Sequence, residues 1–230
     1  MISTTLEHAH GSLQQAPPIA PDRAGAGLSP EQFDRLYADA RRGAGELPWR
    51  RDGAHPALIA WLNAEAPCLL RPGSRVAVVG CGLGDNTAEL LGRGFEVTAF
   101  DCADEAIAWA GDRFPEFRSS FVCADARQPP SRWRHRFDLV VDVDTLPWLT
   151  DADRALVAAG AAELLHPRGL LLVIARGARD AQPAGVGLSP EPLDALMQRH
   201  GLTLARAFDD FEDDANPPVR WLRGVYRRTG

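Results

Sequence analysis

Residues 75–101, RVAVVGCGLGDNTAELLGRGFEVTAFD, constrain the fold more than any other part of the chain. The short apolar run at 76–79, with its β-branched residues, is typical of a strand buried on both faces. Three glycines follow it, and 87–93 is a predicted helix that ends near further glycines. A second strand over 95–100 leads directly to Asp101. This order predicts a parallel α/β unit that holds a nucleoside at the carboxyl ends of its strands.

The spacing of the glycines distinguishes between nucleoside cofactors. Gly80, Gly82 and Gly84 form a GxGxG pattern, and glycine lets the backbone approach a ligand closely. A dinucleotide fingerprint is GxGxxG, and here Asp85 stands where its third glycine belongs. A carboxylate there repels a pyrophosphate at the start of the helix. Asp101 can accept hydrogen bonds from both ribose hydroxyls. The pattern therefore favours S-adenosylmethionine (SAM), which has a ribose but no phosphates, over a nicotinamide dinucleotide.

Composition narrows the class of partner. A chain of 230 residues suits one α/β domain with a short extension, and the formal net charge of -6 argues against binding to a nucleic-acid backbone. The N-terminus lacks the pattern of a signal peptide, and no apolar run is long enough to span a membrane. Four cysteines without a CxxC pair indicate neither disulfides nor a zinc site. We expect a cytoplasmic protein, monomeric or homodimeric, without metal, membrane or nucleic-acid partner.

The chain divides into three parts. Residues 1–28 are rich in Ala, Pro, Gly, Gln and His without periodicity, which predicts a disordered tail. Ser29 is a predicted helix cap with Pro30 in the first turn, and a second apolar helix is predicted over 56–64. Because 29–66 has no place in the sheet, we interpret it as a helical lid. Residues 67–230 then form the nucleoside-binding domain.

Strands and helices alternate beyond Asp101. Helices are predicted at 104–113, 151–165 and 189–200, and strands at 117–123, 137–143, 169–175, 202–208 and 219–226. The alternation predicts an α/β fold with a mostly parallel, seven-stranded sheet and helices on both faces. The last two strands have no helix between them, so one of them is expected to be antiparallel. The acidic run 208–214, FDDFEDD, is a predicted loop, either solvated or a negative rim for a cationic ligand.

From Ser29 onward the chain resembles class I SAM-dependent methyltransferases, whose domain is Rossmann-like. The resemblance is carried by VVGCGLG, by Asp101, by CADA at 123–126, by FDLVVDVDTLPWL and by the turn LHPRGLLLV. In the family the acid in the CADA position commonly contacts the adenine amino group. The resemblance implies cofactor contacts from Trp49, Gly80, Gly82, Gly84, Asp101, Cys102, Asp125, Ala126 and Asp142.

One branch of the family is favoured. Many members carry an acid two positions before the first glycine, but here that residue is Val78, and the thiopurine and thiol methyltransferase branch also tends to be apolar there. FDRLYAD and LPWRRDGAHPALIAWL look similar to the N-terminal segment of that branch, although Arg50 departs from an acid often found after the Trp. The resemblance implies that Trp49 and His55 shape the substrate pocket. Alternatively, Trp49 is an aromatic plug and His55 a residue that begins a helix.

Methyl transfer makes modest demands on the protein. The sulfonium is already activated, so alignment and exclusion of water dominate, and a general base is needed only for an acceptor that holds its proton. Asp144 and His55 are the candidate bases, and Asp144 could instead cap a turn. We predict a SAM-dependent methyltransferase of a small molecule, with a thiol or heterocycle as acceptor. The alternatives are an NAD(P)-dependent oxidoreductase, a methyltransferase of nucleic acid or protein, and a non-catalytic SAM-binding protein.

Overall fold

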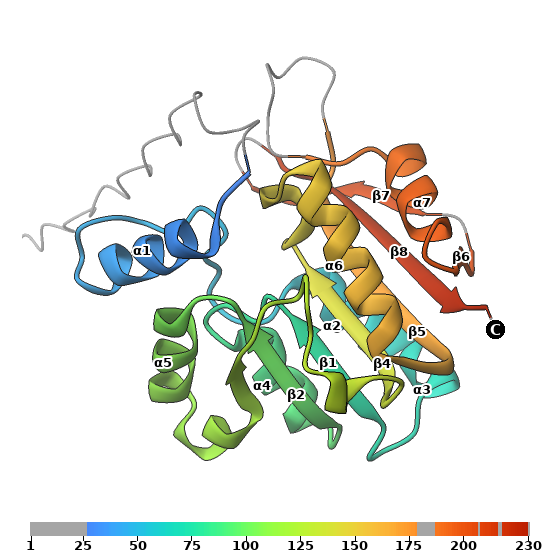
Figure 1. Cartoon of the computed structure of the whole chain (residues 1–230), viewed down its shortest axis with the longest axis horizontal. Coiled ribbons are helices and arrows are strands. Elements are labelled where there is room, and N and C mark those ends of the chain that lie inside the picture. Colours follow the sequence, from blue (N-terminus) through green and yellow to red (C-terminus); the bar gives the residue numbers. More distant parts are fainter. Residues whose placement is uncertain (1–26, 179–186, 207, 216–217, 230) are drawn as a thin grey trace, which may run out of the picture.

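A single mixed β-sheet forms the centre of the computed structural model, which describes residues 27–178, 187–206, 208–215 and 218–229 (Figure 1). Its strands lie in the order β3 (Phe121–Cys123), β2 (Glu96–Asp101), β1 (Arg75–Val79), β4 (Phe137–Val143), β5 (Leu165–Arg176), β8 (Arg220–Arg228) and β6 (Leu202–Leu204). Neighbouring strands from β3 to β5 pair in parallel, whereas β8 pairs antiparallel to β5. This path confirms the predicted seven strands with one of them reversed.

Residues 76–79 of β1 are apolar at every position because both faces of the sheet are covered. In β1, Ala77 and Val79 belong to the hydrophobic core on one face, and Val76 and Val78 belong to the core on the other. The absence of polar alternation in the sequence of β1 is thereby explained.

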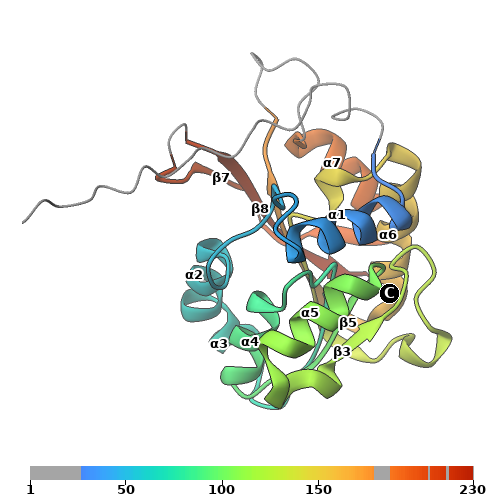
Figure 2. The same cartoon turned by 90° about the vertical axis from the view of Figure 1, so that its left-hand side faces the viewer.

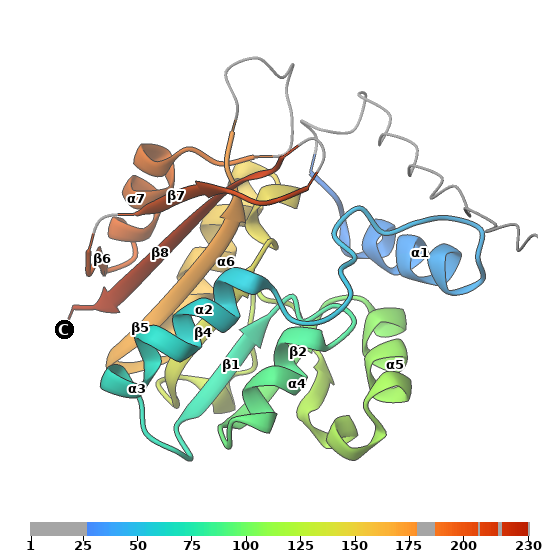
Figure 3. The ribbon, with the colours of Figure 1, turned by 180° about the vertical axis from the view of Figure 1, so that it is seen from behind.

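Helices cover the two faces, as predicted. The helices α2 (Pro56–Ala64), α3 (Ala66–Leu69), α4 (Asp85–Gly92) and α5 (Asp104–Arg113) lie on one face, and α6 (Asp151–Leu164) and α7 (Pro190–Gln198) lie on the other. Figure 3 shows α2, α3 and α4 in front of the sheet, and Figure 2 shows them from the side, across the sheet from α6 and α7. Among the described residues, none of the helices combines the length and apolar character that crossing a bilayer requires.

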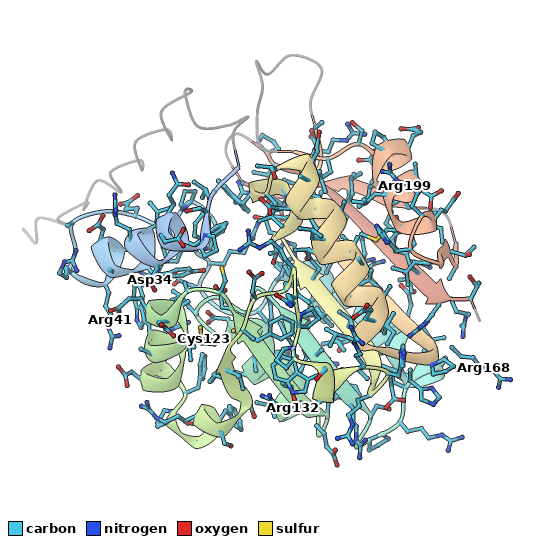
Figure 4. All side chains as sticks on the ribbon, in the orientation of Figure 1. Asp34, Arg41, Cys123, Arg132, Arg168 and Arg199 are labelled. Carbon is cyan, nitrogen blue, oxygen red and sulfur yellow. The ribbon has the colours of Figure 1, made fainter. Side chains whose placement is uncertain are left out.

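The N-terminal helix α1 (Pro30–Arg41) begins with a capping box at Ser29, as the sequence predicted, and lies along α5. Asp34 Oδ1 accepts a hydrogen bond of 2.9 Å from the backbone N–H of Glu105, and Arg41 pairs with Asp112. Figure 4 shows Asp34 and Arg41 on the side of α1 that faces α5. The predicted tail lies almost wholly outside the described residues.

Three strand boundaries were predicted wrongly. The strand predicted at 169–175 begins at Leu165, within a segment that was predicted as a turn. The strand predicted at 117–123 begins only at Phe121, because Pro115–Ser120 forms the 3-10 helix η2. The strand predicted at 202–208 ends at Leu204. Two other short 3-10 helices, η3 (Ser131–Trp133) and η4 (Leu146–Trp148), lie in loops flanking β4.

The acidic run 208–214 contains a strand that was predicted as a loop. Residues Asp209–Glu212 form β7, which pairs with β8 along the same edge as β6. Its acids face arginines: Asp209 pairs with Arg223 at 2.6 Å, Asp210 with Arg220 at 2.5 Å, and Asp213 with Arg51 at 3.2 Å. These pairs engage three of the five acids in the run, and the strand replaces the predicted loop; the alternative of a negative rim stays a prediction. Opposite charges across a strand pair stabilise it.

Candidate active site

A cleft opens at the carboxyl ends of the parallel strands, beneath α1 and the segment that follows it. Open α/β sheets bind ligands at this edge. The cleft brings together ten of the residues singled out in the sequence: Trp49, His55, Gly80, Gly82, Gly84, Asp101, Cys102, Asp125, Ala126 and Asp144. Asp142 is not among the residues that line it.

Close contacts with neighbouring side chains fix the shape of the glycine loop. Gly80 and Gly84 have φ values of 59° and 89°, in the region that L residues rarely adopt. A Cβ on Gly80 would lie 2.3 Å from Thr145 Oγ1, and one on Gly84 would lie 2.8 Å from the ring of Phe121. The loop therefore packs closely against the ends of β3 and β4 and presents its backbone to the cleft.

Asp101 holds a carboxylate beside this loop. Its side chain is largely buried, with 7% of the residue exposed. Oδ2 accepts a 3.0 Å hydrogen bond from Gly82 N–H, and Oδ1 accepts one of 3.0 Å from Ala103 N–H. Burial raises the pKa of Asp101, and the backbone donors oppose that rise. Each carboxylate oxygen can accept a further bond, so the group is oriented and still able to hold ligand hydroxyls.

An ion pair stands at the start of α4. Arg113 reaches both carboxylate oxygens of Asp85, at 2.5 and 2.8 Å, and also donates to the carbonyl of Leu83 at 2.7 Å. The carboxylate therefore occupies the anion-attracting end of the helix with its own partner. A pyrophosphate at this helix end would meet that carboxylate.

The end of β3 supplies another wall of the cleft. Asp125 pairs with Arg127 at 2.6 Å, and Arg127 also reaches Asp153 at 3.1 Å. Arg127 holds the pKa of Asp125 below its usual range, although burial acts in the opposite direction. Gly160 of α6 lies directly beneath, because a Cβ there would be 2.3 Å from the carbonyl oxygen of Ala126. Helix α6 thus sets the position of the Asp125–Ala126 segment.

The two acids near the end of β4 have different surroundings. Asp142 lies behind the cleft and accepts a 3.3 Å hydrogen bond from Thr145 N–H, and burial raises its pKa to about 7. Asp144 lines the cleft with φ 59°, and its Oδ2 accepts a 2.8 Å hydrogen bond from Arg176 Nε. Burial raises the pKa of Asp144, and Arg176 opposes that rise. The carboxylate expected to act as a base is thus engaged in a buried ion pair.

Arg176 connects this ion pair to other segments. Its guanidinium donates to the carbonyl of Pro48 at 3.0 Å and lies 5.6 Å and 5.5 Å from the ring centres of Trp148 and Trp221. The N-terminal segment, β5 and β8 therefore meet around one cation, and the two aromatic rings flank it.

His55 is the N-cap of α2. Its Nδ1 accepts a 3.1 Å hydrogen bond from Ala57 N–H, while Nε2 is buried without a partner among the described residues. Burial, reinforced by Arg51, lowers the pKa of His55 to about 3. The helix-start interpretation describes its geometry, and an additional role in the pocket stays a prediction.

Trp49 lies against other aromatic residues. Its Nε1 donates to the hydroxyl of Tyr37 at 2.9 Å, and its ring centre is 4.9 Å from that of Trp148. The hydroxyl of Tyr37 lies 3.1 Å from the place of a Cβ on Gly82, although nothing in the sequence singled this residue out for the site. Only the polar tip of a tyrosine on an otherwise apolar helix face could have indicated this contact.

Comparison with known proteins agrees with this arrangement. A family model described as a methyltransferase domain matches residues 76–169. The malonyl-[acyl-carrier protein] O-methyltransferase of Acetivibrio thermocellus is 37% identical over 75 residues, which are 32% of this chain and 26% of that protein. The chain thus matches only about a quarter of that relative's length.

Two solved structures share the fold. One, from work on the conversion of a disulfide bond into a thioacetal group during echinomycin biosynthesis, has a TM-score of 0.70 and 20% identity, and covers 85% of this chain and 93% of that one. The other is 1,6-didemethyltoxoflavin-N1-methyltransferase of Burkholderia thailandensis, with a TM-score of 0.67, 22% identity, and coverage of 94% and 93%.

The family match, the order of the strands and the position of Asp101 agree with one another. They favour neither an oxidoreductase nor any particular branch of the methyltransferases, so the thiopurine and thiol branch stays a prediction. Residues 76–169 match the model of a methyltransferase domain, and the chain around them shares the fold of the two solved structures.

Proposed function

We propose that the whole chain is a methyltransferase that transfers the methyl group of SAM to a small molecule. The observation that carries this proposal is the carboxylate of Asp101, fixed by Gly82 and Ala103 at the edge of the cleft. It would accept hydrogen bonds from the ribose hydroxyls, and the 125–126 segment would lie along the adenine. The paired Asp85 at the start of α4 disfavours a dinucleotide.

The cofactor brings the reactive methyl group, and the protein supplies orientation and a dry site. Trp49 and Trp148 form an aromatic wall over the cleft, and Leu28 N–H donates to the carbonyl of Trp148 at 3.0 Å. We propose that α1 and the segment after it act as a lid over the bound cofactor. The lid and the aromatic wall support a small acceptor rather than a protein or nucleic acid.

We further propose a thiol or an aromatic heterocycle as the acceptor. The cleft carboxylates Asp85, Asp125, Asp144 and Asp153 each pair with an arginine, and His55 has its lone pair on Nδ1 engaged. Such a site offers little base assistance, which suits nucleophiles that lose their proton near neutral pH or carry a free lone pair. The Burkholderia thailandensis relative is named for N1-methylation of a didemethyltoxoflavin, which accords with this proposal.

The test is calorimetry followed by an acceptor screen. SAM and S-adenosylhomocysteine should bind at micromolar concentration, and NAD should not bind. Mass spectrometry of reactions with thiol, heterocycle, phenol and amine panels should then show SAM-dependent addition of one methyl group. Tight binding of NAD would refute the cofactor assignment, and SAM binding without any methylated product would favour the non-catalytic alternative.

A second test concerns the lid. Limited proteolysis within residues 43–53 should slow when S-adenosylhomocysteine is added, because closure would protect that segment. Equal cleavage with and without the ligand would refute the lid while leaving the methyltransferase proposal intact.

A further inference from the structure

Two buried N–H groups, on residues that line the cleft, have no hydrogen-bond partner among the described residues. They are His55 Nε2 and Trp148 Nε1, on residues that both line the cleft and are only 4% and 7% exposed. A buried donor without a partner costs about 1–3 kcal/mol relative to one that is satisfied. Two such donors on one ligand cleft indicate that the ligand satisfies them.

The N-cap contact fixes which nitrogen of His55 carries the proton. Ala57 N–H donates to Nδ1 at 3.1 Å, so Nδ1 must keep its lone pair. A neutral imidazole has one donor and one acceptor nitrogen, so the proton is on Nε2. The backbone N–H of His55 donates to Asn86 Oδ1 at 2.8 Å, and this contact holds the residue against the start of α4.

Burial lowers the pKa of His55 and so keeps it neutral, and Arg51 acts in the same direction. Arg51 lies nearby and pairs with Asp213, and Arg176 pairs with Asp144, so each cation facing the imidazole already has its own counterion. The ring of Trp221 stands edge-on to the imidazole, with centres 4.4 Å apart. His55 is therefore oriented from several sides, by α2, by the segment that carries Arg51 and by β8.

We propose that His55 Nε2–H and Trp148 Nε1–H form a hydrogen-bonding subsite for the methyl acceptor, which rests on the proposed function. The subsite would take a planar heteroaromatic acceptor whose ring nitrogen or carbonyl oxygen lies beside the atom that is methylated. His55 acts here as a positioning and specificity residue that donates a hydrogen bond. It does not remove a proton from the acceptor.

A pair of similar thiols tests this subsite. 2-Mercaptopyrimidine has ring nitrogens beside its sulfur, and thiophenol has none. Each is titrated by calorimetry, under reducing conditions, into the protein saturated with S-adenosylhomocysteine. The wild type should bind 2-mercaptopyrimidine at least about tenfold more tightly, because only that probe accepts hydrogen bonds through its ring.

Two amide substitutions at His55 separate its role as the N-cap of α2 from its role as a hydrogen-bond donor to the acceptor. His55→Asn keeps an oxygen that can cap α2 but has no N–H at the Nε2 position, so the preference should fall to below about threefold while thermal stability and S-adenosylhomocysteine binding hold. His55→Gln extends an N–H toward the Nε2 position and is a poor cap, so the preference should persist in a less stable protein. If His55 had only a structural role, His55→Asn would keep the wild-type preference for 2-mercaptopyrimidine over thiophenol.

Trp148 has a matched control. Trp148→Phe keeps a ring without the N–H and should reduce the preference about threefold or more. Trp61 also has a buried, partnerless Nε1, but it lies in the core between α2 and the sheet and does not line the cleft. Trp61→Phe should leave the preference unchanged.

Each outcome of these titrations either supports or contradicts the proposed subsite. A preference that is absent in the wild type, or unchanged in both His55→Asn and Trp148→Phe, would overturn it. So would failure of both probes to bind a protein that does bind S-adenosylhomocysteine, and that result would leave SAM binding intact. Failure to bind S-adenosylhomocysteine at all would instead count against the proposed function.

Discussion

Replacing Asp144 with asparagine separates a structural ion pair from a catalytic base. Asn has nearly the same shape as Asp and tolerates a positive φ, so the value of 59° at this position adds little strain in the variant. The amide can still accept a hydrogen bond from Arg176 Nε, which lies 2.8 Å from Oδ2. The substitution therefore removes mainly the negative charge.

The structure sets the expected magnitude. Removing one partner of a fully buried ion pair costs about 3–5 kcal/mol, and a hydrogen bond to a charged group contributes about 1.5–3 kcal/mol. The Asp144 side chain is 8% exposed and that of Arg176 23%, and Arg176 keeps its bond to the Pro48 carbonyl and its two aromatic neighbours. The free energy of unfolding should therefore fall by about 2–3 kcal/mol, which lowers Tm by roughly 4–12 °C in a chain of this size.

The assay pairs thermal unfolding with turnover of whichever acceptor the screen identifies. Asp144→Asn should lower Tm as stated while turnover below the transition falls less than about tenfold and its pH profile keeps its shape. Asp138→Asn is the control in β4, the strand that ends just before Asp144: Asp138 accepts from Arg75 N–H and has no ion pair among the described residues, so its loss of charge should shift Tm little. Abolished turnover at an unchanged Tm would refute this reasoning and make Asp144 the general base.

Three other substitutions test separate parts of the site. Asp142 stays protonated in the folded protein up to about pH 7 and ionises near pH 4 in the unfolded chain, so the free energy of unfolding should fall as pH rises between these values. Denaturant unfolding should therefore give a free energy about 2–3 kcal/mol lower at pH 8 than at pH 5 because of this residue. Asp142→Asn should remove that difference. Asp101→Asn should weaken SAM binding at least about tenfold by calorimetry, and unchanged affinity would exclude its ribose role. Gly160→Ala should weaken SAM binding despite the better helix propensity of alanine, because the new Cβ meets the Ala126 carbonyl; a more stable variant with normal affinity would contradict this.

The parallel half of the fold could be predicted because its signals are local. The apolar run of β1, the glycine loop and Asp101 are adjacent in sequence and define one supersecondary unit. β7 could not be predicted in the same way. Its sequence, DDFE, is a poor strand by propensity, and it is a strand because Arg220 and Arg223 on β8 face its acids. Those partners lie across a strand pair and cannot be identified from the run itself.

The site likewise has parts that could be predicted from the sequence and parts that could not. Motif spacing placed Asp101, Asp125 and the glycines in one cleft, since all follow directly after strands of one sheet. Sequence could not distinguish Asp142 from Asp144, because only the backbone turn after β4 directs one carboxylate behind the cleft and the other toward Arg176. The tautomer of His55 likewise depends on a cap contact that spacing does not specify.

The ion pair between Arg51 and Asp213 joins two segments that are synthesised at different times. Arg51 is synthesised well before its partner Asp213 and the flanking Trp221. The five strands that pair in parallel with one another, β1 to β5, precede residue 177, so the nucleoside side of the cleft can fold on the nascent chain. The acceptor side is completed only when β8 inserts between β5 and β6, because β8 is synthesised after both of them. The segment that carries Arg51 is thus made before the sheet and secured only after β8 is made, so a nascent chain should gain cofactor affinity before it gains acceptor selectivity.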